Sequence, residues 1–350
     1  MTLPPDFVPR RVLVLRPRGL GDVVLSTAVV DALKRAWPAV PVDYLSERPS
    51  GDLLRGDDRL DRIFLLGPGP DDDGRVTGGG TMDAVRWIRA GRPDLVLDLF
   101  SNPKTALLTA LSGARYRAGL NKRPRRLAYN LRVPRFRGRP EDDHRYAQDV
   151  QLDFLRAAGV RWPGEARARI ALADEERAFA ADVLRDLGYS PDARFGAVLP
   201  GGSWESKRWS VAGYAATAAD VARRLGRPTL VLWGPPERDD ARAIAAELGD
   251  SGRLAPPTSL RQMAAVLAGA SILISPDCLG RHFGVVLGVP TVGVFGSTDP
   301  RDWTPREGPH RTVRGGPDEG FASLRDLPAE PVIVAARNLL DEVDARQGPA

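Results

Sequence analysis

An aspartate closes a glycine-containing turn that follows the first apolar run of the chain. The run Arg11–Arg16 is followed by Gly19, Gly21 and Asp22. The glycines permit a tight turn, and the free N–H groups at the start of a helix can bind an anionic or polar ligand. The Asp22 carboxylate could stabilise the helix dipole or act as a general base at the mouth of a cleft. The residue types alone favour the first role.

A second loop combines small residues with a lysine. Gly201, Gly202 and Ser203 follow an apolar strand, and Lys207 precedes the next helix. Backbone donors followed by an ammonium group suit a phosphate, although the order of residues is not that of a Walker A loop. Lys207 is one of only four lysines in an arginine-biased chain. This scarcity favours a phosphate-binding role over that of a solvated loop lysine.

A third loop of the same kind brings an acid, a thiol and two basic side chains together, namely Asp277, Cys278, Gly280, Arg281 and His282. A histidine near the start of a helix can meet a phosphate oxygen, and the arginine fork suits the same anion. The alternative is that the histidine packs in the domain and the arginine is solvated. We interpret Cys278 as a small buried residue, because no histidine and acid are placed to activate it. In a fourth loop, Glu237 could accept hydrogen bonds from a ribose or cap the helix after it.

Strand–helix alternation must position these loops, and it occurs twice. Short apolar runs typical of buried parallel strands alternate with helical patterns. Strands are expected at 11–16, 42–45, 63–66, 95–99, 195–199, 229–233, 271–274 and 291–295, and helices at 23–37, 104–111, 149–158, 174–187, 211–225, 241–248, 260–267 and 332–343. Residues 67–81 are expected to form a loop. The pattern predicts an α/β fold of two doubly wound units, with ligands bound outside the carboxyl ends of the strands in a cleft between the units.

Composition limits the class of protein. The chain has 350 residues, 43% hydrophobic and 27% charged, which indicates roughly two folded domains. A single cysteine permits no intramolecular disulfide and indicates a reducing cytoplasm, and three histidines are too few for a convincing zinc site. We expect no signal peptide and no membrane span. The net charge of +5 comes mainly from arginine, and no zinc-finger spacing or basic zipper points to nucleic acid.

In combination and order, these segments resemble glycosyltransferase family 9, the ADP-heptose:lipopolysaccharide heptosyltransferases. The resemblance extends from about Arg11 to Pro305. It rests on the segments 12–27, 94–99 with 106–114, 200–203 with 207–209, 233–237, Asp277 with His282, and 295–300. No single motif is specific, but the combination is.

The resemblance implies a GT-B fold of two Rossmann-like domains facing across a cleft, and inverting sugar transfer. Residues 1–175 would form the acceptor-binding domain and residues 176–328 the nucleotide-sugar domain, with a C-terminal helix in 329–350 that packs back on the first domain. No cofactor would be required. The co-substrate would be a nucleotide-diphosphate sugar, with ADP-heptose favoured, and the acceptor a saccharide or glycolipid. The protein would act in the cytoplasm at the inner face of the membrane.

By the same resemblance, Asp22 matches the catalytic base and Arg18, Gly19 and Gly21 belong to the acceptor side. The donor would be bound by Gly201, Gly202, Ser203, Lys207, Glu237, Asp277, Cys278, Gly280, Arg281 and His282, with no metal. Lys207, Arg281 and His282 would stabilise the negative charge that grows on the leaving diphosphate.

The chain departs from the family pattern in the third loop. The family has a hydroxyl residue and a glycine after the aspartate, where this chain has Cys278 and Leu279, with Gly280 displaced by one. Two alternatives therefore stay open. One is a dinucleotide-dependent oxidoreductase, which Val24 disfavours because it replaces the third glycine of the dinucleotide fingerprint. The other is a non-catalytic protein that binds a sugar or nucleotide.

An arginine-rich stretch, residues 115–139, falls in the presumed acceptor domain. It is either a solvated loop enriched by codon bias or a docking face. A docking face of this charge would suit an anionic acceptor or an acidic membrane surface.

Overall fold

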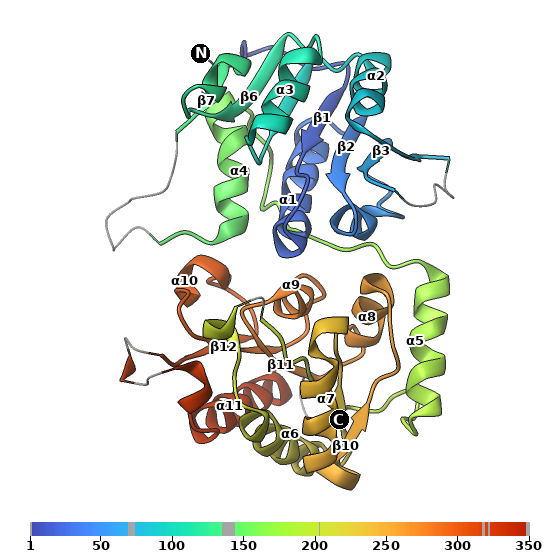
Figure 1. The fold of residues 1–350 in the computed structure, drawn as a ribbon, viewed down its shortest axis with the longest axis vertical. Coiled ribbons are helices and arrows are strands. Elements are labelled where there is room, and N and C mark those ends of the chain that lie inside the picture. Colours follow the sequence, from blue (N-terminus) through green and yellow to red (C-terminus); the bar gives the residue numbers. More distant parts are fainter. Residues whose placement is uncertain are drawn as a thin grey trace. The chain divides into compact units, whose positions relative to one another are not determined.

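The chain folds into two compact units, Met1–Ala171 and Leu172–Ala350. The structure is a computed structural model that describes residues 2–68, 74–134, 144–202, 204–316, 319–320 and 323–347. Each unit is built around a parallel β-sheet with helices packed on it (Figure 1). This arrangement confirms the predicted α/β class.

The sheet of the first unit has the order β4-β3-β2-β1-β5-β6-β7, and every pair of neighbours is parallel. Its strands are β1 (Val12–Leu15), β2 (Val42–Glu47), β3 (Arg62–Leu66), β4 (Val76–Gly79), β5 (Leu95–Asp98), β6 (Tyr116–Leu120) and β7 (Leu131–Val133). Helices α1 (Leu20–Ala36) and α4 (Ala147–Ala158) pack together, as do α2 (Thr81–Gly91) and α3 (Pro103–Leu111). All four residues of β1 are buried, as expected for a central parallel strand covered on both faces.

The second unit repeats this plan with the sheet order β10-β9-β8-β11-β12-β13. Its strands are β8 (Gly196–Val198), β9 (Thr229–Val231), β10 (Gly252–Leu254), β11 (Ile272–Pro276), β12 (Thr291–Phe295) and β13 (His310–Arg314). Its helices are α5 (Asp174–Asp186), α6 (Val211–Leu225), α7 (Arg238–Leu248), α8 (Leu260–Leu267), α9 (Leu279–Val286), α10 (Pro300–Trp303) and α11 (Glu330–Gln347). Ser210 caps α6 by accepting a hydrogen bond from Gly213 N, and Gly226 ends it in the left-handed conformation, as the sequence indicates.

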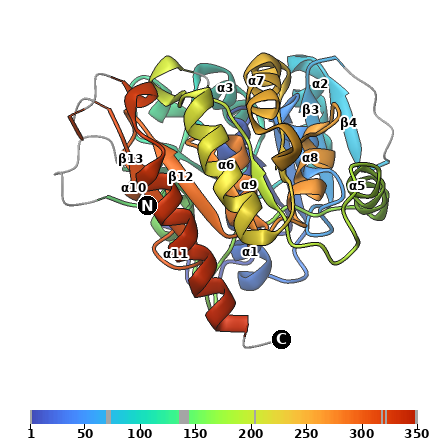
Figure 2. The same ribbon diagram turned by 90° about the horizontal axis from the view of Figure 1, so that it is seen from below.

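The C-terminal helix α11 packs on its own unit. It lies beside α6 (Figure 2) and contacts β13 as well. Its buried apolar residues include Val332 and Leu339, and Arg337 pairs with Asp220 of α6 at 2.6 Å. The apolar stripe of α11 and its ion pair with α6 hold this helix on the second unit. That residues 329–350 also pack against the N-terminal domain stays a prediction.

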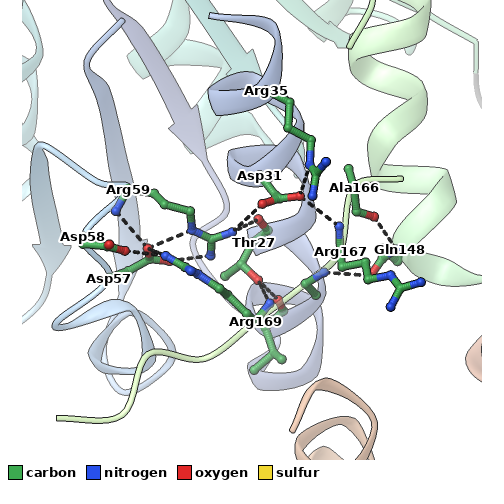
Figure 3. A network of polar contacts seen from close by, with 12 residues as sticks. Thr27, Asp31, Arg35, Asp57, Asp58, Arg59, Gln148, Ala166, Arg167 and Arg169 are labelled. Atoms are coloured by element: carbon green, nitrogen blue, oxygen red, sulfur yellow. Dashed lines mark hydrogen bonds and ion pairs between the residues drawn. The ribbon is translucent and has the colours of Figure 1, made fainter. Parts of the chain in front are cut away.

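The segment that leads to the second unit is fastened to the first (Figure 3). Thr27 and Asp31 of α1 accept hydrogen bonds from the backbone N–H groups of Arg169 and Arg167 at 2.9 and 3.2 Å. Gln148 of α4 accepts another from Ala168 N at 3.1 Å. These bonds make residues 166–169 part of the first unit, which ends at Ala171, four residues before the predicted boundary.

Two expectations about local structure are wrong. Residues 67–81 are not all loop, because 76–79 form β4 at the edge of the sheet. Pairing with β3 gives this glycine-containing segment a strand conformation that its low β-propensity does not indicate. The first helix begins at Leu20 rather than Val23, so Gly21 and Asp22 lie in its first turn. Gly19 makes this possible, because it occupies the N-cap with a positive φ of 90°.

Candidate functional site

The turn between β1 and α1 holds Asp22 against an arginine. A Cβ atom on Gly19 would lie 2.6 Å from Asp22 Oδ2, so only glycine fits at this position. The carboxylate pairs with Arg16 Nη2 at 2.7 Å, and about a third of the Asp22 side chain is exposed. Asp22 is therefore not the N-cap of α1. It is an oriented and accessible carboxylate in the first turn, a position that also suits the helix dipole.

Arg16 makes two further contacts besides its pair with Asp22. Its Nη1 donates to the carbonyl of Leu99 at 2.9 Å, and its guanidinium lies 5.1 Å from the centre of the Phe100 ring. Both partners follow β5, the neighbour of β1 in the sheet. The ends of two adjacent strands thus fix the orientation of the Asp22 carboxylate through one cation.

Arg18 pairs with a residue that lines a pocket, and the sequence does not indicate this pocket. Its Nε donates to Glu47 Oε2 at 3.0 Å, and Lys104 Nζ lies 3.3 Å from Glu47 Oε1. Glu47 and Lys104 line a cavity of about 600 Å³ together with Arg48, Gly67, Gly80 and Thr81. These residues follow the carboxyl ends of β2 to β5, the edge at which α/β sheets bind ligands. Lys104 is another of the four lysines, and this rarity, which also marks Lys207, is the signal in the sequence that indicates it.

In the second unit, the loop after β8 brings the backbone of Lys207 close to Gly202. Gly202 has a φ of 128°, and a Cβ atom there would lie 2.9 Å from the carbonyl oxygen of Lys207. This position requires glycine because only glycine permits the close backbone approach. Lys207 ends the 3₁₀ helix η3 (Glu205–Lys207). Ser203 lies outside the described residues.

Lys207 and Asp277 form the charged centre of this unit. Lys207 Nζ lies 2.6 Å from Asp277 Oδ2, which also accepts a hydrogen bond from Thr298 Oγ1 at 2.8 Å. The side chain of Asp277 is 4% exposed. Burial alone would raise the pKa of Asp277, but the Lys207 ammonium, Arg281 and Thr298 lower it below its ordinary value. Asp277 is thus a buried carboxylate that holds the lysine in place.

Arg281 is buried rather than solvated. Only 1% of its side chain is exposed, and its Nη2 donates to the carbonyl of Trp303 at 2.5 Å. The guanidinium lies 5.2 Å from the centre of the Phe295 ring and 4.0 Å from Asp277 Oδ1. Arg281 therefore binds the loop after β12 to the start of α9.

His282 is a neutral side chain close to the charges of Arg281, Asp277 and Lys207. It is buried, and burial lowers its pKa to about 3, with Arg281 and Lys207 acting in the same direction against Asp277. Its Nδ1 is buried without a hydrogen-bond partner among the described residues. The Trp303 ring lies 5.9 Å away, edge to face. A neutral imidazole can donate or accept a hydrogen bond but carries no charge, so it would stabilise an anion only as a donor.

Gly201, Glu237 and Cys278 come together from three loops. A Cβ atom on Gly201 would lie 3.6 Å from Cys278 Sγ and 3.7 Å from Glu237 Cγ. Glu237 occupies the N-cap position of α7 but makes no side-chain capping bond, and burial raises its pKa. The backbone N–H groups of Gly234 and Glu237 and the charge of Arg208 oppose this rise, so the carboxylate already has partners in its own loop.

Cys278 and Gly280 form the start of α9. The Cys278 Sγ lies 3.3 Å from Ser275 Oγ, and burial raises the pKa of the thiol, in keeping with a packing role. A Cβ atom on Gly280 would lie 2.7 Å from Leu199 Cδ1. Gly280 therefore allows α9 to approach the end of β8 closely.

The described residues contain no group of three or more His, Cys, Asp or Glu side chains placed to hold a metal ion. Nor do they contain a helix with the length and apolar character that crossing a membrane requires.

Comparisons with known proteins agree on one family. The model of glycosyltransferase family 9 (heptosyltransferase) matches residues 83–319. The chain is similar to lipopolysaccharide heptosyltransferase 1 of Pseudomonas aeruginosa, with 29% identity over 299 residues that cover 83% of this chain and 79% of that protein. The predicted family is confirmed.

Solved structures agree on the fold. A glycosyltransferase family 9 structure from Veillonella parvula has a TM-score of 0.81 at 22% identity, covering 95% of this chain and 97% of that one. An Escherichia coli heptosyltransferase with ADP has a TM-score of 0.67 at 21% identity, covering 94% and 99%. The predicted GT-B fold is confirmed.

Proposed function

This chain belongs to glycosyltransferase family 9 (heptosyltransferase), and on that premise we propose that it transfers a heptose from ADP-heptose to a hydroxyl of a lipopolysaccharide acceptor, with inversion at the anomeric carbon. As a member of this family it is a glycosyltransferase. The observation that carries the finer proposal is the pairing of Lys207 with a buried Asp277, beside a histidine whose Nδ1 has no partner among the described residues. Such a group of donors suits the diphosphate of a nucleotide sugar.

We assign the general base to Asp22. Its carboxylate would accept the proton of the acceptor hydroxyl while that oxygen forms a bond to the anomeric carbon. The bond from this carbon to the diphosphate oxygen breaks in the same step, and ADP leaves with the electron pair. Arg16 supports this role because it fixes the carboxylate without enclosing it.

We assign the diphosphate site to the second unit. An ammonium group has three donors, so Lys207 can bind Asp277 and still donate to a phosphate oxygen. His282 would donate from its imidazole, and Gly201 would let the diphosphate approach the backbone. Arg281 acts as a positioning residue that holds the loop after β12. Glu237 would accept hydrogen bonds from the ribose.

We assign the acceptor to the pocket beside Arg18. The Glu47 carboxylate can accept hydrogen bonds from sugar hydroxyls, and Arg48 and Lys104 can pair with an acidic group. A glycolipid acceptor would place the reaction in the cytoplasm, at the inner face of the membrane.

The experiment that tests the proposal is calorimetric titration with ADP, UDP, GDP and NAD⁺ in separate runs. We expect selective binding of ADP. In a Lys207→Ala variant the dissociation constant for ADP should rise by about tenfold or more, because a charge-assisted hydrogen bond is lost and the buried Asp277 carboxylate loses its lysine partner. A Lys122→Ala variant in the first unit is the matched control and should bind ADP like the parent.

The other outcomes have definite meanings. Preference for UDP or GDP would keep sugar transfer and change the donor. Binding of NAD⁺ alone would favour the oxidoreductase alternative. Binding of ADP without any transfer to acceptor would favour the non-catalytic alternative. Unchanged affinity in the Lys207→Ala variant would remove Lys207 from the donor site.

A further inference from the structure

The first unit carries an exposed apolar surface on α3 and the 3₁₀ helix η2 (Arg125–Ala128), two elements that pack together. Leu127 is 78% exposed, Leu107 is 52% exposed, and Leu111 lies one helical turn after Leu107 on α3 and is also exposed. We call Leu107, Ala110, Leu111 and Leu127 the leucine patch. A shallow groove of about 300 Å³ runs through it, lined by Leu107, Ala110, Pro124, Arg125, Leu127 and Ala128. Single exposed leucines are ordinary, but a contiguous apolar patch marks an interaction site.

Polar contacts hold the leucine patch in place. On one side of Leu127, Arg125 Nη1 donates to the carbonyl of Ser101 at 3.0 Å. On the other side, the carbonyl of Ala128 accepts a hydrogen bond from Arg117 Nε at 2.8 Å. The next residue, Tyr129, is buried and its hydroxyl donates to the buried Asp98 at 2.6 Å. The backbone on both sides of Leu127 is therefore fixed, and the fold holds this leucine in solvent.

The segment that carries the leucine patch is basic. Its described residues 99–134 contain eight Lys or Arg and no Asp or Glu, although the whole chain has a net charge of only +5. Within this stretch, Arg123 is exposed and Arg126 half-buried, and both belong to the segment that carries Leu127. A second copy of the same face would bring like charges together, which disfavours self-association. An apolar centre with a basic surround complements a bilayer that contains anionic lipids.

We infer that the leucine patch is a docking surface for an acidic lipid bilayer, in which Leu107, Leu111 and Leu127 enter the headgroup region while Arg123 and Arg126 pair with anionic headgroups. This contact needs neither substrate of the proposed transfer reaction. It can therefore be tested separately from that reaction, and either proposal can fail without the other.

The test is flotation of the full chain with vesicles of phosphatidylcholine alone and of phosphatidylcholine with phosphatidylglycerol, without nucleotide or acceptor. We expect binding to the anionic vesicles only, weakening as salt is raised. A Leu107→Ser/Leu127→Ser double variant should bind about tenfold or more weakly, because it loses two apolar side chains that the bilayer would bury. An Arg123→Gln/Arg126→Gln variant should lose about fivefold per arginine and most of the salt dependence.

A Val334→Ser variant serves as the matched control, because Val334 is an exposed apolar residue on α11 of the other unit. It should bind vesicles like the parent. All variants change exposed or half-buried side chains, so a thermal melt should show the parent stability and exclude unfolding as a cause.

Three outcomes would overturn the inference. The first is no binding to anionic vesicles at low salt. The second is vesicle binding that the leucine substitutions leave unchanged. The third is a concentration-dependent dimer in sedimentation velocity that the same substitutions abolish, which would make the occupant a second copy of the chain.

Discussion

The charged side chains of the proposed site are exposed to solvent in the first unit and buried in the second. In the first unit, Asp22 is about one-third exposed and Arg18 is mostly exposed, and the pairs they form border open pockets or solvent. In the second unit, Asp277 and Arg281 are almost fully buried and His282 is buried beside them. Both sets follow the carboxyl ends of parallel strands, so the fold alone does not produce the difference.

This difference has a physical meaning. Buried charges are tolerated only when they are paired and hydrogen-bonded, which fixes their geometry before a ligand arrives. Exposed pairs contribute little to stability and can rearrange around a ligand. We therefore expect the second unit to recognise a constant group, the diphosphate, and the first unit to adapt to a larger and more variable acceptor.

The largest effect should come from Asp22→Asn. The amide cannot accept the proton of the acceptor hydroxyl, so the rate of transfer should fall by about 100-fold or more, whereas ADP affinity should stay within about twofold of the parent. Steady-state kinetics and titration measure the two quantities. Asp83→Asn is the matched control, because Asp83 is an exposed acid in the first turn of α2. A variant rate within threefold of the parent would mean that Asp22 is not the base.

A smaller effect should distinguish the two units by how their unfolding free energy depends on pH. Because the pKa of His282 lies at about 3 in the folded chain, below its ordinary value of 6.5, the neutral form stabilises the fold above pH 6.5. That contribution is lost as the pH falls from 6.5 towards 3. His310 on β13 behaves alike, because burial lowers its pKa to about 4. Between pH 7 and pH 5, each histidine should cost the second unit about 2 kcal/mol of unfolding free energy.

Hydrogen exchange on peptides of β8 and β11 measures this loss, because central strands exchange through global unfolding of their unit. A His282→Gln variant should lose about half of the pH dependence, whereas a His144→Gln variant in the first unit should keep all of it. An unchanged pH slope in the His282→Gln variant would contradict the buried neutral state of this histidine.

The smallest effect should come from Lys104→Ala in the first unit. Lys104 is 40% exposed in its pair with Glu47, and a contact of this kind contributes about 1 kcal/mol or less. The KM for acceptor should therefore rise by about threefold to fivefold, with kcat and ADP affinity unchanged. Arg86→Ala on α2 is the control, because Arg86 is an exposed cation paired with Asp83 and does not line the pocket. A loss of ADP affinity in the Lys104→Ala variant would contradict the division of roles between the units.

The sequence was sufficient to predict the elements whose pattern is local. Val12–Leu15 is a continuous apolar run, and Ser210 and Gly226 mark the two ends of α6 by their own chemistry. It was insufficient for β4, because an edge strand with two glycines has a conformation that only pairing with β3 supplies. Residues 310–314 are a similar case, because they form β13, a polar edge strand that pairs with β12.

The site was predictable as a set of loops but not as a set of contacts. The order of the loops indicated Asp22, Lys207 and His282 through the family resemblance. Nothing in the sequence shows that Arg281 is enclosed by Trp303 and Phe295, because that contact joins residues far apart in the chain. The Glu47–Lys104 pocket was missed for the same reason, since its walls come from the ends of several strands.

The single cysteine gives the second unit one site for labelling by thiol chemistry. Cys278 is the one sulfhydryl in 350 residues, and its sulfur lies near Gly201 at a half-buried position. A thiol-reactive dye or a ¹⁹F-trifluoromethyl tag would therefore label the unmodified chain at one position. Because the thiol is half-buried and its pKa is raised, labelling would be slow, and a nucleotide bound against Gly201 would slow it further, without a substrate turnover assay.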